Sequence, residues 1–146
     1  MKLEVRQVTQ VTDSLLEAFG RLMPQLSPRL EAPSGERLRA VAAGPSAALF
    51  TAESGGAVVG VLTLVWYDVP SGRKAWIEDV VVDAEARGTG AGRALVAAAL
   101  EHAAAVGAEK VQLTSNPARE AARALYRKIG FEEAGTTVFA IKTDAK

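Results

Sequence analysis

The stretch from Asp83 to Leu95, DAEARGTGAGRAL, has glycine at three alternate positions, Gly88, Gly90 and Gly92. It follows the apolar run VVV and precedes a segment whose apolar residues have helical spacing. A glycine-rich turn between a strand and a helix is a typical phosphate site, because free backbone N–H groups and the positive end of the helix dipole point at the anion. The sequence therefore predicts a phosphate-binding loop; the alternative is a loop whose glycines only permit tight turning.

Two common phosphate loops do not fit these residues. A dinucleotide-binding loop requires glycine three positions after Gly90, where this chain has Arg93. A nucleoside-triphosphate loop requires Gly-Lys followed by Ser or Thr, and the sequence does not contain it. A phosphate bound here would have to belong to another kind of ligand.

The elements around the loop follow from changes in hydrophobic period along the chain. Alternating or continuous apolar runs predict strands at residues 2–8, 47–53, 57–69, 74–83, 109–115 and 137–142. Apolar residues at helical spacing predict helices at residues 13–23, 35–43, 91–107 and 117–130. Glycine turns between the second, third and fourth strands predict two antiparallel hairpins. The fold class is mixed α/β (α+β), and the glycine loop joins its fourth strand to its third helix.

Residues that commonly begin helices support these boundaries. Thr12 or Asp13 is expected to cap the first helix, and Ser34 the second. Asn116 is expected to cap the last helix, with Pro117 at its first position.

Composition limits the classes of protein that the chain can belong to. A length of 146 residues predicts one domain, residues 1–146. The absence of cysteine excludes disulfides and cysteine nucleophiles and is compatible with a cytoplasmic location. Seventeen basic and seventeen acidic residues balance, so neither nucleic acid nor a membrane is an expected partner. The only histidine, His102, lies in the third predicted helix away from the loop, and no metal is expected.

The loop residues resemble the hallmark of the GNAT (general control non-repressible type) family of acyl-CoA N-acyltransferases, which is Arg/Gln-x-x-Gly-x-Gly/Ala after a central strand. Arg87, Gly90 and Gly92 match this motif, preceded by the common lead-in IEDVVVD. ALYRKIGF, residues 124–131, resembles the second motif of the family, a helix running into the next strand. The resemblance covers nearly the whole chain. It implies a mixed, mostly antiparallel sheet of about six to seven strands flanked by about four helices.

The resemblance also implies that acetyl-CoA is the cosubstrate. In this family the amides of the loop bind the pyrophosphate of coenzyme A, which by position implies a coenzyme site at Arg87, Gly88, Thr89, Gly90, Ala91, Gly92 and Arg93. Val80, Val81 and Val82 would offer backbone groups to the pantetheine arm, because an open strand edge can pair with an extended, amide-rich chain.

Acetylation of an amine needs a base. An alkylammonium group with a pKa of about 10.4 costs about 4.6 kcal/mol to deprotonate at pH 7, and a carboxylate near the acyl carbon would offset that cost. Glu78 and Asp79 lie directly before the expected pantetheine segment. Neighbours on a strand point to opposite faces, so at most one of them faces the acceptor, and we expect Glu78. Alternatively, one of the two is an ordinary exposed or ion-paired carboxylate.

The departing thiolate needs a proton, and the resemblance implies a general acid at Tyr126, where the family commonly has one. Transfer from a phenol of pKa about 10 to a thiolate of pKa about 8.5 is uphill by only about 2 kcal/mol. The alternative is that Tyr126 packs as an aromatic anchor beside Leu125 and Ile129.

The chain departs from the family pattern at one coenzyme contact. Many relatives have an asparagine seven residues before the tyrosine, where it hydrogen-bonds coenzyme A. This chain has Arg119 there, and Asn116 three residues earlier. Both are candidate coenzyme ligands, Arg119 through a phosphate or an amide. Asn116 as a helix cap alone is the alternative.

We therefore expect an N-acetyltransferase that moves the acetyl group from acetyl-CoA directly to a primary amine, without a covalent intermediate. A small-molecule amine is preferred, because the chain shows no acidic run for basic protein tails, and residues 23–45 are expected to line its pocket. A protein N-acetyltransferase and a non-catalytic acyl-CoA sensor are the alternatives. Because relatives often dimerise, a homodimer is also expected.

Overall fold

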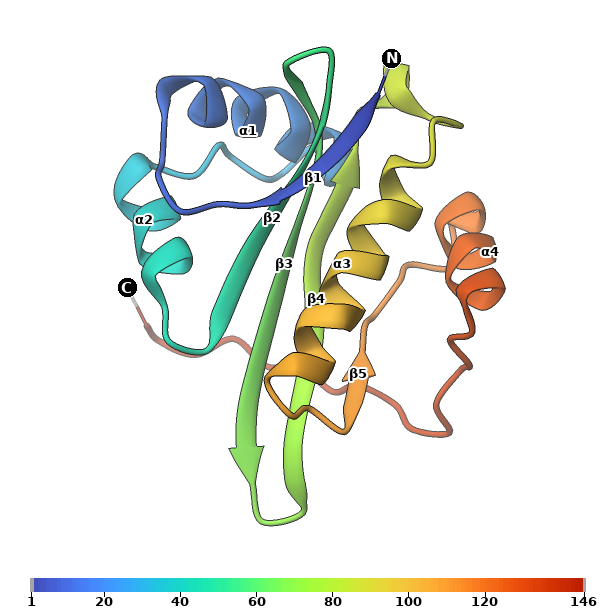
Figure 1. Ribbon diagram of the computed structural model, residues 1–146. Coiled ribbons are helices and arrows are strands. Elements are labelled where there is room, and N and C mark those ends of the chain that lie inside the picture. The colour runs from blue at the N-terminus through green and yellow to red at the C-terminus, as the bar shows by residue number, and fades with distance from the viewer. Residues whose placement is uncertain (1, 146) are drawn as a thin grey trace. The chain divides into compact units, whose positions relative to one another are not determined.

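The computed structural model describes residues 2–145, which divide into a first unit up to Thr114 and a second unit from Ser115 onward (Figure 1). The first unit contains β1 (Leu3–Gln7), α1 (Asp13–Leu26), α2 (Gly35–Ala43), β2 (Ala47–Ser54), β3 (Ala57–Val69), β4 (Gly72–Val82), the short 3-10 helix η1 (Ala84–Ala86), α3 (Ala91–Ala105) and β5 (Lys110–Gln112). The second unit contains α4 (Glu120–Ile129).

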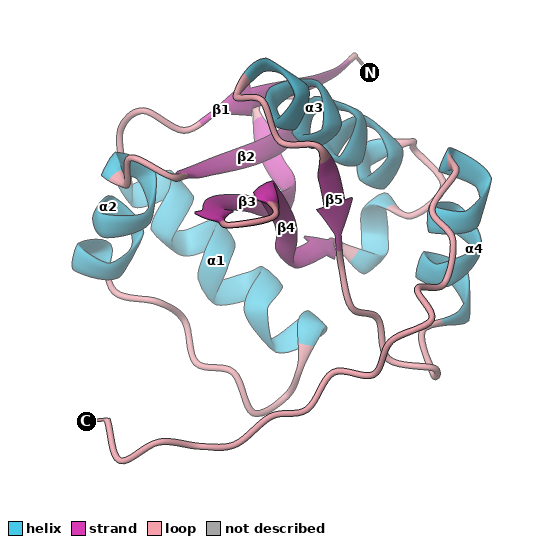
Figure 2. Cartoon of the chain, turned by 90° about the horizontal axis from the view of Figure 1, so that it is seen from below, coloured by secondary structure: helices cyan, strands magenta, loops and turns pink. Residues whose placement is uncertain are grey.

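A five-stranded sheet in the order β1-β2-β3-β4-β5 forms the centre of the first unit. The first four strands are antiparallel to their neighbours, and β5 runs parallel to β4. The two predicted hairpins, β2–β3 and β3–β4, are confirmed, and the mixed, mostly antiparallel sheet agrees with the expected fold class. α1 and α2 cover one face of the sheet and α3 covers the other (Figure 2).

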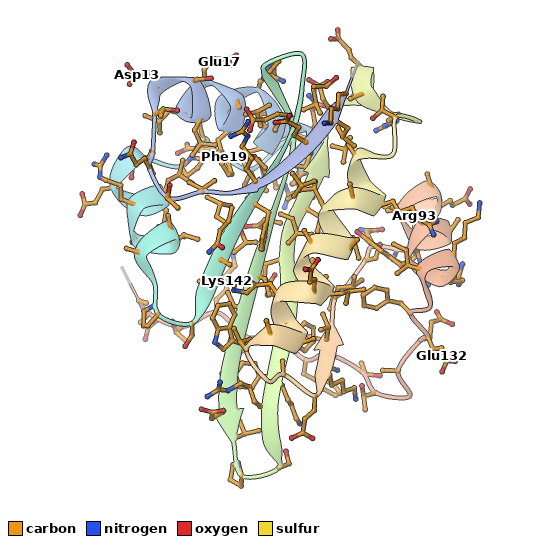
Figure 3. All side chains as sticks on the ribbon, viewed as in Figure 1. Asp13, Glu17, Phe19, Arg93, Glu132 and Lys142 are labelled. Carbon is orange, nitrogen blue, oxygen red and sulfur yellow. The ribbon has the colours of Figure 1, made fainter. Side chains whose placement is uncertain are left out.

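Both faces of the central strands are buried, which explains their continuous apolar runs. On one face, Leu15, Phe19 and Leu22 of α1 join a core with Leu49 and Val61. Phe19 points from α1 toward the sheet, whereas Asp13 and Glu17 point outward (Figure 3). The helical spacing of the apolar residues therefore sets which side of α1 faces the sheet.

Helix caps confirm two of the predicted starts. The Thr12 hydroxyl accepts a hydrogen bond from the Leu15 amide at 3.2 Å, which selects Thr12 over Asp13 as the cap of α1. The Ser34 hydroxyl accepts one from the Arg37 amide at 3.0 Å at the start of α2. Each side-chain oxygen satisfies one of the amides that have no acceptor within the helix.

The predicted start of the last helix is wrong by about one turn. α4 begins at Glu120 with Arg119 as its first flanking residue. Asn116 instead closes a turn, in which its side-chain oxygen accepts the Ala118 amide at 2.9 Å and its carbonyl accepts the Arg119 amide at 2.9 Å. Asn side chains form such turns as readily as helix caps, so the residue type alone could not distinguish the two.

The sheet has five strands in residues 2–145, not six to seven. The predicted strand at 109–115 is paired only at Lys110–Gln112, and the predicted strand at 137–142 is not a strand. Its apolar residues Val138, Phe139 and Ile141 are 63%, 90% and 92% exposed. An alternating pattern shows that a segment can form a strand, but a strand forms only where its backbone finds a hydrogen-bonding partner.

The helices in the described part of the chain include none that is both long enough and apolar enough to cross a membrane.

Gly60 of β3 allows α3 to approach the sheet. A Cβ atom at this position would lie 3.0 Å from Cδ1 of the fully buried Leu95 and 3.3 Å from the Val81 carbonyl oxygen. Gly60→Ala is therefore expected to lower the free energy of unfolding by about 1–3 kcal/mol through overpacking. Chemical denaturation measures the change.

Gly20→Ala is the matched control. Gly20 is an exposed residue of α1, and its added Cβ would meet only the Ala32 Cβ, at an ordinary 3.9 Å. This variant should gain about 0.5–1 kcal/mol from helix propensity. A Gly60→Ala protein as stable as the wild type would show that α3 does not depend on this close contact.

Candidate functional site

The glycine loop lies between η1 and α3, and two of its glycines have left-handed backbone conformations. Gly88 has φ of 81° and Gly90 has φ of 89°. An added Cβ would meet nothing within 4 Å at either position. Glycine is therefore required there by the backbone dihedral and not by crowding, and the space next to the loop backbone is open.

Backbone amides at this loop are available to a ligand. Hydrogen bonds within the described residues do not use the amides of Gly88, Gly90, Ala91, Gly92 and Arg93. The last three belong to the first turn of α3, whose N–H groups have no acceptor within the helix. The Thr89 amide and hydroxyl both donate to the Ala86 carbonyl oxygen, at 3.3 and 2.6 Å. The loop thus presents a set of donors at the positive end of a helix dipole.

β4 has an open edge just before this loop. The pairing of β5 with β4 covers Lys74–Trp76, whereas β4 continues to Val82. Beyond Trp76, β4 has no strand partner on its β5 side among residues 2–145, and this stretch includes Val80–Val82. The chain thus has an open strand edge where an extended amide chain was expected to pair.

A β-bulge interrupts β4 at the two candidate base residues. Val61 pairs with Val81 but Thr63 pairs with Glu78, so β4 has one residue more than β3 across this step. Asp79 has a positive φ of 49°, and both Glu78 and Asp79 are exposed. The regular alternation of side chains between the two faces of the sheet is therefore interrupted at Glu78 and Asp79, because a bulge changes the direction of the side chains at the extra residue.

The electrostatics of the bulge affect Glu78. Although the Glu78 side chain is exposed, neighbouring protein atoms remove part of the water around its carboxyl group. This desolvation is the larger cause that raises the pKa of Glu78 above its ordinary value, and the negative charge of Asp79 is the smaller one. A carboxylate with a raised pKa holds a proton more strongly, which makes it a better base at neutral pH than an ordinary glutamate.

Tyr126 lies on α4 in the second unit and is buried. The centre of its ring lies 6.0 Å from that of the Phe131 ring in an edge-on arrangement, so its aromatic neighbour is the second residue after the helix. Burial raises the pKa of the Tyr126 phenol, and the charge of Arg119 opposes this shift. The phenol is thus held in its protonated form, as a proton donor must be before it acts.

Two further polar aromatic side chains, His102 and Trp76, have neighbours within the first unit. The His102 ring packs against the rings of Phe50 and Trp66, whose centroids lie 5.6 and 5.3 Å away. Trp76 donates its ring N–H to the Tyr67 hydroxyl at 2.9 Å across the β3–β4 hairpin. No group of three or more His, Asp or Glu side chains among residues 2–145 is arranged to hold a metal ion.

Sequence reasoning missed two polar residues of α1 that contact the beginning of the loop. Arg21 forms an ion pair with Asp83 at 2.6 Å, and Gln25 accepts the Ala84 amide at 2.8 Å. The Glu85 amide and then the Arg21 and Gln25 side chains lower the pKa of Asp83, against the effect of burial. The only sequence signal was that Arg21 and Gln25 lie four residues apart, on the same polar side of an amphipathic helix.

The family of the chain follows from a comparison with protein-family models. Residues 10–131 match the Acetyltransferase (GNAT) family, so the protein belongs to this family. The match covers the glycine loop, both carboxylates of the bulge and Tyr126.

Solved structures share the fold over almost the full chain. A transcriptional regulator from Bacillus halodurans C-125 is 25% identical with a TM-score of 0.81, covering 97% of this chain and 100% of that one. An aminoglycoside acetyltransferase from an uncultured soil metagenomic sample is 26% identical with a TM-score of 0.80, covering 99% and 100%. AAC(6′)-Iy, in complex with the bisubstrate analog CoA-S-monomethyl-acetylneamine, is 21% identical with a TM-score of 0.79, covering 98% and 99%. A search of curated protein sequences gives no significant match.

Proposed function

We propose that this protein transfers the acetyl group of acetyl-CoA directly to the primary amine of a small molecule, through one N-acetyltransferase domain that spans residues 1–146. The observation that carries the proposal is the glycine loop. Its left-handed glycines and free amides lie at the N-terminus of a helix, directly after an open strand edge. Membership of an acetyltransferase family and the likeness to a structure with a coenzyme A analog support it.

In this proposal, Arg87 and the loop from Gly88 to Arg93 bind the pyrophosphate of the coenzyme through the five amides that are free in the loop. The Thr89 amide would join them by leaving the Ala86 carbonyl oxygen. Charge-assisted hydrogen bonds of this kind contribute about 1.5–3 kcal/mol each. The backbone of Val80–Val82 binds the pantetheine arm as a neighbouring strand would. Either Asn116 or Arg119 adds a further contact, although the Asn116 side chain already closes a turn.

Two side chains would move the protons of the reaction. Glu78 takes a proton from the ammonium group of the acceptor, directly or through water, with Asp79 as the alternative base. The neutral amine then forms a bond to the thioester carbonyl carbon, and the carbon–sulfur bond breaks. Tyr126 donates its phenolic proton to the departing thiolate. The nitrogen loses its second proton as the amide forms, and that proton returns Tyr126 to the neutral phenol, directly or through water. The products are an amide and free coenzyme A.

A small-molecule acceptor is preferred to a protein. The similar aminoglycoside acetyltransferase supports this choice, because an aminoglycoside is a small molecule that carries amines. The acceptor would bind against residues 23–45, which run from the end of α1 through α2. The cytoplasmic location and the homodimer stay predictions that rest on composition and on the family resemblance.

A non-catalytic acyl-CoA sensor is a second candidate, favoured by the similarity to a transcriptional regulator at 25% identity. A sensor would bind acetyl-CoA without releasing coenzyme A in the presence of amines. An assay of free thiol over a panel of amines, with aminoglycosides and diamines included, therefore distinguishes the two functions.

Acetyl-CoA should raise the melting temperature by roughly 5–10 °C at a hundredfold excess over Kd, because a ligand that binds only the native state stabilises it. NAD and ATP at the same concentration should do little. Gly90→Val should abolish the shift, because a β-branched residue is strained at a φ of 89° and rearranges the loop. The measurement is a side-by-side thermal shift. A shift with NAD or ATP equal to that with acetyl-CoA would show that the loop is assigned to the wrong ligand.

Tyr126→Phe removes the hydroxyl and keeps the ring that packs against Phe131. If the phenol is the acid, turnover should fall by about 10²- to 10⁴-fold while the melting temperature changes little. A purely packing role predicts that both stay near the wild-type values. Steady-state kinetics and thermal melting of the same preparation test the two roles together.

Glu78→Gln should change the pH dependence of both rate and stability. As the base, Glu78 must be deprotonated, so its replacement should remove the acidic limb of the kcat/KM profile. Since the pKa of Glu78 is raised in the folded protein, its stabilising contribution is complete below the unfolded pKa and is lost as pH rises through the folded one. The melting temperature of Glu78→Gln minus that of the wild type should therefore increase as pH rises from the unfolded to the folded pKa of Glu78.

Asp79→Asn is the paired variant for the same two measurements. Loss of the acidic limb in this variant and not in Glu78→Gln would move the role of base to Asp79. If both variants kept the limb, deprotonation would have to occur through water or in solvent.

A further inference from the structure

α1 makes a set of polar contacts with the point at which β4 ends and the glycine loop begins. Nη1 of Arg21 lies 2.6 Å from Oδ2 of Asp83. One helical turn later, Gln25 donates to Oδ1 of Asp83 at 3.5 Å and accepts the Ala84 amide at 2.8 Å. Two side chains of one helix thus contact both the carboxylate and the next backbone amide.

Arg21 is itself held in place. Its Nη2 donates to the Val58 carbonyl oxygen at 3.2 Å, and its Nε donates to Glu17 at 3.3 Å. The Asp83 side chain is only 11% exposed, which distinguishes this ion pair from a solvated surface pair. The guanidinium therefore links α1, the beginning of β3 and the residue that follows β4.

A chain of hydrogen bonds continues from Asp83 into the loop. Oδ1 of Asp83 accepts a hydrogen bond from the Glu85 amide at 3.1 Å, and the backbone carbonyl oxygen of Asp83 accepts one from the Ala86 amide at 2.8 Å. The Ala86 carbonyl oxygen in turn accepts the Thr89 amide and hydroxyl. The position of Asp83 thus sets the position of η1, and η1 sets that of the loop that contains Gly88.

We propose that Arg21 and Gln25 are positioning residues for the coenzyme: through Asp83 they hold the loop in the conformation that presents its amides, and so set coenzyme affinity and not the rate of acyl transfer. The inference rests on the proposed function of the loop. A loop that is already ordered loses less conformational entropy when a ligand binds, and its affinity is correspondingly higher.

The chain offers a matched control for the loss of such an arginine. Arg73 at the far end of β4 also forms an ion pair with an aspartate, Asp68, at 2.7 Å, and donates to a backbone carbonyl, that of Val106, at 2.8 Å. The Arg21 and Arg73 side chains are exposed to nearly the same extent, 36% and 40%. Arg73 belongs to no part of the proposed site.

Arg21→Ala is expected to raise the Kd for coenzyme A about tenfold by calorimetry, and Arg73→Ala less than twofold. In kinetics, Arg21→Ala should raise the KM for acetyl-CoA by a similar factor and leave kcat and the KM for the amine within twofold. Arg21→Lys, which keeps a charge near Asp83, should recover part of the affinity. The melting temperature of each variant is measured in parallel, so that a loss of affinity is compared with a loss of stability.

Gln25→Ala provides a second variant if Arg21→Ala does not fold, and it should raise the Kd severalfold. The inference alone would be overturned if the wild type binds coenzyme A tightly, Gly90→Val does not bind it, and the folded Arg21→Ala and Gln25→Ala variants keep the wild-type Kd. Equal losses of affinity in Arg21→Ala and Arg73→Ala would also overturn it, because they would reflect general destabilisation. A wild-type protein that does not bind coenzyme A would overturn the proposed function and this inference together.

Discussion

The close contact between Leu95 of α3 and Gly60 of β3 determines where the helix begins relative to the sheet. Leu95 is fully buried and lies one turn after Ala91, the first residue of α3. The approach is possible because Gly60 has no side chain, and a Cβ there would lie 3.0 Å from the Leu95 side chain. The free amides of the first helical turn are thus positioned by core packing some distance away from them. A core contact of this kind is rigid, because protein interiors are close-packed.

The end of β4 combines three departures from regular sheet structure within a few residues. The strand loses its pairing with β5, a bulge adds one residue at Asp79, and the chain then turns through η1 into the loop. Each departure leaves polar groups without sheet partners, and such groups are available for ligands. The Asp83 amide still donates to the Val59 carbonyl oxygen of β3 at 2.8 Å, and the polar contacts of α1 hold the Asp83 side chain and the Ala84 amide that follow the sheet.

Features encoded by neighbouring residues could be predicted from the sequence, and features that depend on distant contacts could not. The hairpins and the caps at Thr12 and Ser34 follow from local patterns and are confirmed. The predicted strand at 137–142 failed because a local pattern cannot supply a partner strand. Likewise, the ion pair between Arg21 and Asp83 joins residues 62 positions apart, and neither residue type is unusual in its own segment.

In the candidate site, too, local features could be predicted from the sequence and features that depend on distant contacts could not. The glycine loop and its place between a strand and a helix were evident from spacing, and the left-handed dihedrals of Gly88 and Gly90 agree with it. The bulge at Glu78 and Asp79 was not evident, because a bulge depends on the register between two strands and not on either strand alone. The roles of these residues and of Tyr126 in catalysis stay predictions.

The position of the two tryptophans has a consequence for spectroscopy. Trp66 and Trp76 are the only tryptophans of the chain, and both lie on the β3–β4 hairpin. At about 3.3 Å per strand residue, Trp76 is roughly 20 Å along β4 from Asp83, where the loop segment begins. Trp66 lies beside the His102 ring, and Trp76 is hydrogen-bonded to Tyr67. Intrinsic fluorescence therefore reports on the packing of the hairpin against α3, and movements of the loop need a probe of their own.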